Sequence, residues 1–258
     1  MQGGGHIRCY AIDGEAAKQV TEAFAAKQNS CGGFLFAVGD GNHSLATAKT
    51  CWENIKKSGK FTEEQLKTHP ARHALVEICN LHSEALEFKP IHRLLTNIDV
   101  KDMLSFFEAE ITKQGLESTE GDEIVFEYVE SGSCDSAKPA NGNEVVSENN
   151  DGRCTAPIKN SGINITNRGD RLPVEILQGI LDKYLETHGN VEIDYIHGDE
   201  ALHGLVKETK GCGIFLQSID KSTLFPAINA GGVLPRKTFS IGEANEKRYY
   251  MECHKISM

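Results

Sequence analysis

The sequence lacks any long apolar run, although 39% of its 258 residues are hydrophobic. A helix that spans a membrane needs roughly 20 consecutive apolar residues, and the mean hydropathy of this chain is only −0.36. The first residues also lack the apolar stretch of a secretory signal. We therefore expect a soluble, cytoplasmic protein with no membrane partner.

Paired cysteines are absent as well. The eight cysteines are scattered singly, without a Cys-x-x-Cys pair, which predicts reduced thiols rather than a disulfide framework. His69 and His73 are the only close histidine pair, and Pro70 between them prevents a shared helical face, so a structural zinc site is not expected. Cys253 beside His254 is the nearest candidate for a reactive thiol, with an ordinary strand residue as the alternative.

Basic residues are in deficit, because 27 Lys and Arg face 37 Asp and Glu, for a formal net charge of −10. General binding to nucleic acid requires a basic surface that neutralises phosphates, so this charge argues against it. A local basic segment does lie near the C-terminus and comprises Arg236, Lys237, Lys247, Arg248 and Lys255. This segment could contact a partner; the alternative is a solvated edge of mixed charge.

Strand patterns alternate with helix patterns along the chain. Apolar runs predict strands at 6–12, 34–38, 74–81, 86–95, 124–129, 155–158, 162–166, 191–197, 213–217 and 248–256. Apolar residues at helical spacing predict helices at 15–28, 43–57, 100–113, 173–188 and 200–210. Thr62 opens a further short helix through a capping box to Gln65. The alternation predicts an α/β fold, with α+β as the alternative, in which helices cover the faces of a mixed β-sheet.

The length of 258 residues suits one large domain or two smaller ones. Residues from about 131 to 153 are rich in Ser, Asn, Gly and charged types and carry almost no large apolar side chain. Such a segment cannot offset the entropy that it would lose on ordering. We expect a single domain over residues 1–258, with a mobile insertion at 131–153.

The most pointed chemical feature is the turn Asp40-Gly41-Asn42-His43, which lies between a predicted buried strand and a predicted helix. Gly41 permits a positive φ, so several backbone N–H groups can point at one spot near the positive end of the helix dipole. This arrangement is typical of phosphate sites. Asp40 could hold Mg²⁺ or accept a proton, while Asn42 and His43 could bond to phosphate oxygens. The alternative is that Asp40 or Asn42 simply caps the helix.

The segment Phe36–Ala48 (FAVGDGNHSLATA) resembles the signature of the family known as domain of unknown function 1015. Three later stretches resemble further landmarks of that family, namely Pro90–Arg93, Ile193–Gly198 and Gly232–Ser240. The resemblance thus covers nearly the whole chain. It also implies a further N-terminal region in the family, so we expect that this chain lacks that region.

The Asp-Gly-His-His-Arg turn of that family resembles the Gly-x-x-Arg box of the ParB and sulfiredoxin-like proteins. That group includes nucleotide binders and a free-serine kinase. This resemblance implies a ParB/sulfiredoxin-like core element and a nucleotide with Mg²⁺ as cofactor. Two positions depart from the family's turn: Asn42 stands where His is frequent, and Ser44 stands where Arg follows. The hydroxyl of Ser44 donates one neutral hydrogen bond in place of a bidentate guanidinium, which weakens the expected phosphate site.

A later loop offers a second set of ligand groups. Pro235–Ser240 follows a Gly-Gly turn and carries two cations and two hydroxyls over a short span. Lys237 is the preferred candidate to bind a phosphate chain, and Arg236 is the second. The alternative is that the two cations protect an edge strand from aggregation.

Two histidine positions are further candidates. His92 beside Arg93 could relay a proton or bind an anion, and its alternative is a satisfied structural hydrogen bond. His197 ends a predicted strand, where open sheets place ligands if the strands there are parallel. The alternative for that position is a turn, with Asp199 capping the next helix.

Two hypotheses of function follow. The first is a protein that binds a nucleotide or another phosphate-bearing small molecule, as a Mg-dependent phosphotransferase for a small hydroxylated metabolite, with Asp40 and His43 as catalytic residues. The phosphates would be held by Gly41, Asn42, Ser44, Arg236 and Lys237. The alternative is a non-catalytic, nucleotide-responsive or DNA-associated adaptor of the ParB-like type that uses the C-terminal basic segment.

Overall fold

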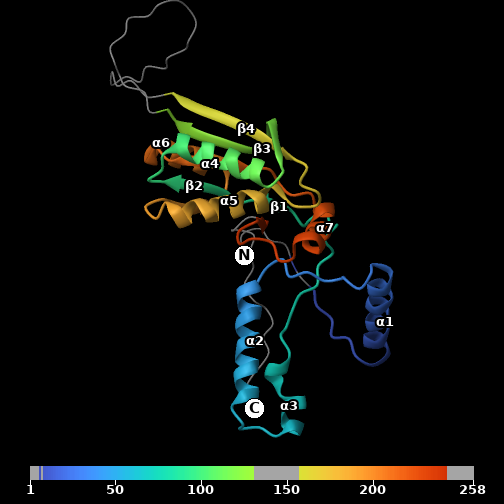
Figure 1. Ribbon diagram of the computed structural model, residues 1–258. Coiled ribbons are helices and arrows are strands. Elements are labelled where there is room, and N and C mark those ends of the chain that lie inside the picture. The colour runs from blue at the N-terminus through green and yellow to red at the C-terminus, as the bar shows by residue number, and fades with distance from the viewer. Residues whose placement is uncertain (1–5, 7, 131–156, 243–258) are drawn as a thin grey trace, which may run out of the picture. The chain divides into compact units, whose positions relative to one another are not determined.

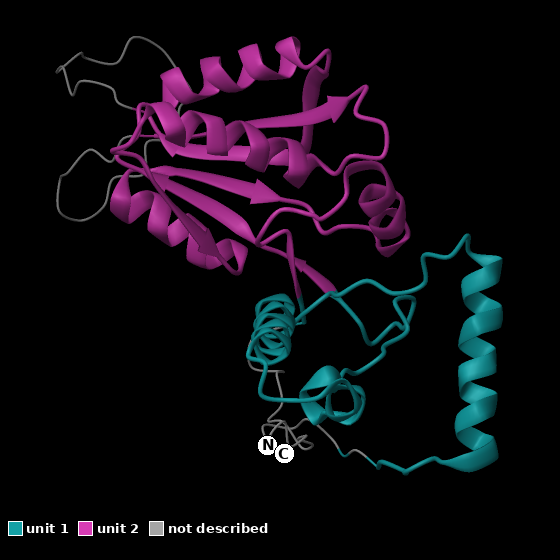
Figure 2. Cartoon of the chain, turned by 60° about the horizontal axis from the view of Figure 1, so that its bottom comes forward, with its two compact units in different colours: residues 1–87, 241–258 teal, residues 88–240 magenta. Residues whose placement is uncertain are grey.

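The computed structural model describes residues 6, 8–130 and 157–242. The chain forms two compact units, which Figure 2 colours separately: unit 1 comprises residues 1–87 and 241–258, and unit 2 comprises residues 88–240. The single domain expected over residues 1–258 stays a prediction. The insertion expected at 131–153 and the strand expected at 248–256 lie outside the described residues.

Unit 1 is helical in its described part (Figure 1). Helix α1 spans Gly14–Ser30, α2 spans Asn42–Lys57, α3 spans Glu63–Thr68, and a 3-10 turn spans Pro70–Arg72. The predicted capping box of α3 is present, because Thr62 Oγ1 accepts from the Gln65 amide at 3.3 Å and Gln65 Oε1 accepts from the Thr62 amide at 2.9 Å. The helices predicted for this part of the chain are therefore confirmed.

The strands predicted for unit 1 do not form. The described residues of 6–12, 34–38 and 74–81 contain no strand. Apolar side chains in these segments face solvent, since Phe36 is 50% exposed and Leu75 is 64% exposed. A strand needs a neighbour that receives its backbone hydrogen bonds, and among the described residues none of these three segments has a strand neighbour. The prediction of a buried strand directly before the Asp40 turn is therefore wrong.

Unit 2 is built on a five-stranded sheet of order β4-β3-β6-β2-β5. The strands are β2 (His92–Thr96), β3 (Glu117–Val129), β4 (Ile158–Thr166), β5 (Glu192–Ile196) and β6 (Cys212–Leu216). Every pairing between neighbours in this sheet is antiparallel. The expected combination of a sheet with helices on its faces is confirmed, but its neighbouring strands are not of mixed direction.

The helical connections explain why every neighbouring pair of strands in this sheet is antiparallel. The helix between β2 and β3 joins two parallel strands, but β6 lies between them; likewise β5 and β6 are parallel and enclose β2. Two split β-α-β units are thus interleaved. Strand-helix alternation predicts parallel crossovers, and these do occur. It does not reveal that an antiparallel strand from elsewhere in the chain separates each pair.

Helices cover both faces of the sheet (Figure 2). On one face, α4 (Val100–Lys113) and α5 (Pro173–Thr187) contribute Phe107 and Leu177 to the main core. On the other face, α6 (Asp199–Thr209) packs Leu202 and Val206 on Leu94. Because side chains alternate along a strand, the two neighbours on β2, Leu94 and Leu95, belong to opposite cores.

A further helix and a small second sheet complete the described fold. Helix α7 spans Lys221–Gly231, and Asp220 caps it by accepting from the Ser222 amide at 2.8 Å. No helix is predicted there, because Pro226 inside the segment interrupts the helical pattern. The strands β1 (Phe88–Pro90) and β7 (Phe239–Ile241) pair as a separate two-stranded sheet. Among the described residues, no helix combines the length and apolarity that crossing a bilayer requires.

Candidate functional site

Gly41 shapes the turn that precedes α2. It is the N-cap residue of this helix, with φ 76° and ψ 17°, a left-handed conformation that other side chains disfavour. Its amide donates to Asp40 Oδ1 at 2.8 Å. Within the described residues no side chain caps α2, so the alternative in which Asp40 or Asn42 caps this helix is wrong. Asn42 is instead its first helical residue.

Three backbone amides open α2 ahead of its first internal hydrogen bond. That bond runs from the Leu45 amide to the Gly41 carbonyl at 2.9 Å, so the amides of Asn42, His43 and Ser44 receive no partner from the helix. All three residues are exposed. The first turn contains no acidic residue and the last turn is basic, so no helical carboxylate cancels the positive end of the dipole. This end of α2 therefore presents solvent-facing donors to an anion.

Asp40 determines what kind of anion this turn could hold. Its carboxylate accepts from the Gly41 amide, directly before these donors, and its negative charge offsets their positive potential. A divalent cation between Asp40 and a phosphate would remove that conflict. The described residues contain no group of three or more His, Cys, Asp or Glu side chains that could hold a metal. Mg²⁺ commonly takes one or two carboxylates, waters and the ligand's own phosphates, so Asp40 fits it only as a single protein ligand.

Arg236 and Lys237 occupy the tip of a turn in unit 2. Both are exposed, and Lys237 has a positive φ of 59°. Thr238 Oγ1 closes the turn by donating to the Pro235 carbonyl at 2.6 Å. Strand β7 begins only after this turn, so the two cations precede the strand rather than belong to it. The Asp40 turn is part of unit 1, and a ligand shared by the two turns stays a prediction.

His92 is buried in β2, and both of its ring nitrogens have partners. Nδ1 accepts from the Leu216 amide at 3.1 Å, which leaves the proton on Nε2, and Nε2 donates to Asp199 Oδ1 at 2.8 Å. Burial lowers the pKa of His92, while the bond to Asp199 partly opposes this effect. This is the geometry of the structural hydrogen bond that the sequence left as an alternative.

The neighbours of His92 differ from what the sequence suggested. Asp199 bonds to His92, and the N-cap of α6 is Gly198, without a side-chain cap. The predicted helix cap by Asp199 is therefore wrong. His197 is exposed directly after β5 and lies close enough to His92 to lower its pKa. Because β5 pairs with β2 in the antiparallel sense, the parallel arrangement that would make His197 a ligand position is absent from this pairing.

Arg93 lies on the face of β2 opposite to His92. Its side chain is fully buried: Nε and Nη2 both donate to Gln178 Oε1 at 3.2 Å, and Nη1 donates to the Ile91 carbonyl. The guanidinium carbon lies 5.0 Å from the centre of the Tyr195 ring. Burial lowers the pKa of Arg93 to about 10. A guanidinium enclosed in this way has no surface at which to receive a ligand.

One polar pair escaped the sequence analysis. On the α6 side of the sheet, His203 Nδ1 lies 2.8 and 2.9 Å from the two carboxylate oxygens of Glu127, which is only 4% exposed. The Phe215 ring lies between this pair and His92, with ring-centre distances of 4.6 Å to His203 and 5.3 Å to His92. Glu127 stands opposite Ile124, Phe126 and Tyr128 in the alternating segment 124–129, a position where the pattern predicts an exposed polar residue, so the sequence contains no sign that α6 covers it.

Comparison with known proteins identifies a family but no activity. The family model described as "Protein of unknown function (DUF1015)" matches residues 1–165. No curated protein matches this chain.

Solved structures share a distant likeness. A conserved hypothetical protein from Pyrococcus furiosus is 13% identical with a TM-score of 0.40, over 65% of this chain and 61% of that one. A variant free serine kinase in complex with ADP is 13% identical with a TM-score of 0.41, over 64% of this chain and 58% of that one. In complex with AMP, the variant kinase is 14% identical with a TM-score of 0.45, over 87% of this chain and 80% of that one. Likenesses of this degree give no residue of this chain a role, and the similarity to ParB-like proteins stays a prediction.

Proposed function

This chain belongs to the DUF1015 family of unknown function, and from its own geometry we propose that it binds a phosphate-bearing small molecule, most simply a nucleotide, at the start of α2. The observation that carries the proposal is the trio of exposed amides of Asn42, His43 and Ser44, which lie ahead of the first helical hydrogen bond. Gly41 makes the turn in front of them. Phosphate oxygens are the acceptors that such helix starts commonly bind.

The side chains of the first turn add polar groups to these amides. Asn42 offers an amide, His43 an imidazole and Ser44 a hydroxyl, and each can donate to a phosphate oxygen. An exposed helix start stabilises an anion by only about 0.3–1 kcal/mol. The turn alone would therefore hold a phosphate weakly, and tight binding requires further cations. We propose Lys237 and Arg236 as these cations and Mg²⁺ at Asp40 as the ion that relieves the repulsion between carboxylate and phosphate.

We further propose that the bound nucleotide donates a phosphoryl group to a small hydroxylated metabolite in the cytoplasm. In this step the bond between the transferred phosphorus and the nucleotide's bridging oxygen breaks, and a new bond forms to the metabolite's hydroxyl oxygen. Asp40 or His43 takes the hydroxyl proton. Phosphoryl transfer depends mainly on positioning and charge neutralisation, which suits a turn of donors assisted by cations. The formal net charge of −10 argues against the alternative of a DNA-associated adaptor.

Binding is tested by thermal unfolding of the full chain with AMP, ADP and ATP, each with and without Mg²⁺. A ligand at a hundred times its Kd adds about 2.7 kcal/mol to stability, which is readily measured. Asp40→Asn should remove the Mg-dependent part of the shift. Its matched control is Asp13→Asn, because Asp13 also precedes a helix and its side chain makes no cap bond. If Asp40→Asn and Asp13→Asn respond to every nucleotide as the parent does, the turn is not the site.

Lys237→Asn tests the second turn. Asn tolerates the left-handed conformation of Lys237, so the change removes the charge without adding strain. Lys210→Asn is the control, because Lys210 is also exposed and has a φ of 54°. We expect Lys237→Asn to weaken the nucleotide shift with and without Mg²⁺, and Lys210→Asn to leave it unchanged. Transfer is then assayed with free serine and other small hydroxy compounds as acceptors; binding without transfer to any of them would leave the kinase proposal without support.

A further inference from the structure

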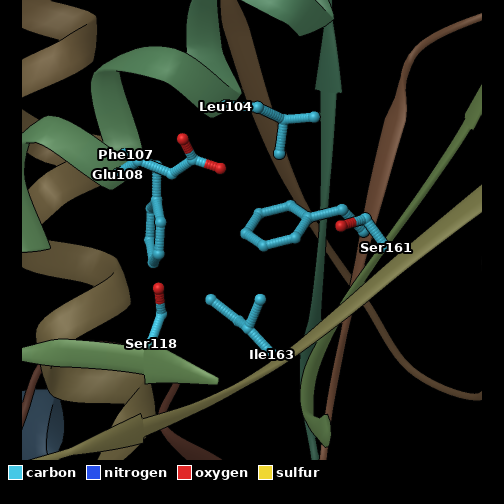
Figure 3. Close-up of a pocket in the computed structure, with 7 residues that line it drawn as sticks. Leu104, Phe107, Glu108, Ser118, Ser161 and Ile163 are labelled. Atoms are coloured by element: carbon cyan, nitrogen blue, oxygen red, sulfur yellow. The ribbon is translucent and has the colours of Figure 1, made fainter. Parts of the chain in front are cut away.

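A small pocket lies in unit 2 between α4 and the strands β3 and β4 (Figure 3). Its volume is about 50 Å³. Apolar side chains form its floor: Leu104 and Phe107 come from α4, Phe126 from β3 and Ile163 from β4. The two phenyl rings meet edge to face, with centres 5.4 Å apart. At roughly 10–15 Å³ for each enclosed water, the pocket accepts about three to five water-sized groups.

Three oxygen-bearing side chains stand around this apolar floor. Glu108 follows Phe107 on α4, Ser118 lies near the start of β3, and Ser161 lies on β4 directly opposite Phe126 in the strand register. Figure 3 shows the carboxylate of Glu108 and the hydroxyls of both serines at the pocket. Within the described part of the chain, no lysine or arginine forms an ion pair with Glu108, and neither serine hydroxyl takes part in a hydrogen bond. The pocket thus combines one unpaired negative charge with two unused hydroxyls.

We propose that this pocket binds the primary ammonium group of a small amine, with the rest of that molecule remaining outside. An ammonium group carries a positive charge and three donors. Ser118 pairs with Ile165, four residues along β4 from Ser161, so one ammonium group reaches Glu108 and one of the two serine hydroxyls, and water accepts its third hydrogen bond. The phenyl face next to it adds a cation–π attraction. A phosphate or a carboxylate is excluded by the charge of Glu108. The volume is far below the several hundred Å³ of a complete ligand pocket, so it admits a head group and a short part of its chain.

The inference is independent of the proposed phosphate site, because it uses no residue of the Asp40 turn. Its test is titration of the full chain with n-propylammonium chloride, followed through the NMR signals of the Leu104 and Ile163 methyl groups and the Phe107 ring. 1-Propanol and sodium propionate at equal ionic strength are the matched ligand controls. We expect saturable shifts with propylammonium and none with propionate.

Three variants assign the binding to the pocket. Glu108→Gln should weaken the propylammonium affinity about fivefold, the range of an exposed ion pair, and Ser161→Ala about threefold, the range of one hydrogen bond. Glu186→Gln is the control, because Glu186 is an exposed glutamate on α5 that does not line the pocket. Equal shifts with 1-propanol, or an unchanged affinity in Glu108→Gln, would show only an apolar gap and overturn the inference. An unchanged affinity in Asp40→Asn would separate this site from the proposed nucleotide site.

Discussion

Lowering the pH should destabilise unit 2 through a single buried imidazole. His92 is 1% exposed, and its Nδ1 accepts from the Leu216 amide. Protonation would place a second N–H on Nδ1, opposite that amide donor, and would bury a positive charge. Both effects disfavour the charged form in the folded state, consistent with a pKa below the ordinary value of 6.5.

The sign of the effect follows from proton linkage. Because the folded pKa of His92 is lowered, the unfolded chain binds this proton first as the pH falls. The contribution to stability is fully present above pH 6.5 and is lost as the pH falls from 6.5 through the folded pKa. Between those two values one proton is linked to unfolding, so stability falls by at most about 1.4 kcal/mol for each pH unit.

The assay is urea unfolding followed by far-ultraviolet circular dichroism at a series of pH values from 8 down to 5, on the parent and on His92→Gln. The glutamine keeps a polar side chain but does not titrate, so its stability should fall less steeply below pH 6.5. His82→Gln is the control, since it removes one exposed histidine of unit 1. The reasoning is refuted if parent and His92→Gln lose stability in parallel, or if the NMR signal of His92 titrates above pH 6.5.

Three further predictions concern backbone and hydrogen-bond positions, each measured by urea unfolding. Gly213→Ala should cost about 1–3 kcal/mol, because the added Cβ would lie 2.6 Å from Val206 Cγ2 on α6; Gly204→Ala, with no atom within 4 Å, should instead stabilise by about 0.5–1 kcal/mol, and equal effects would contradict the close packing of α6 on β6. Gly41→Ala should destabilise by about 1–2 kcal/mol because of its φ of 76°, whereas Gly41→Asn should cost less; a neutral alanine would refute the left-handed turn. Tyr184→Phe should cost about 1 kcal/mol, because the hydroxyl of this buried ring donates to a carboxylate on α4 at 2.8 Å, and an unchanged midpoint would show that this bond contributes nothing.

The features that the sequence predicts well are those that depend on neighbouring residues along the chain. The capping box of α3 joins Thr62 to Gln65, and both of its hydrogen bonds form. The helical segments at 100–113 and 173–188 correspond closely to α4 and α5. In these cases every interaction that defines the element lies within one or two turns, so the pattern contains the information needed.

The strand predictions divide according to whether a partner exists. The segments at 191–197 and 213–217 become β5 and β6, because β2 lies between them and pairs with both. The segment at 34–38 is at least as apolar but forms no strand. An apolar run indicates that burial of its side chains would stabilise the protein. It does not show whether a neighbouring strand is present to pair with the run and bury it. For this reason the strand expected before the Asp40 turn does not form. The turn itself does form, because its geometry depends only on the local conformation of Gly41.

Adjacency in sequence also misleads where strands are concerned. His92 and Arg93 are adjacent in the sequence and read there as one polar pair. Side chains alternate along a strand, so His92 bonds to Asp199 of α6 while Arg93 bonds to Gln178 of α5, on the other face of the sheet. The true partners stand 107 and 85 residues away. A functional interpretation of a strand dipeptide therefore requires knowledge of which helix covers each face, and only the assembled sheet provides it.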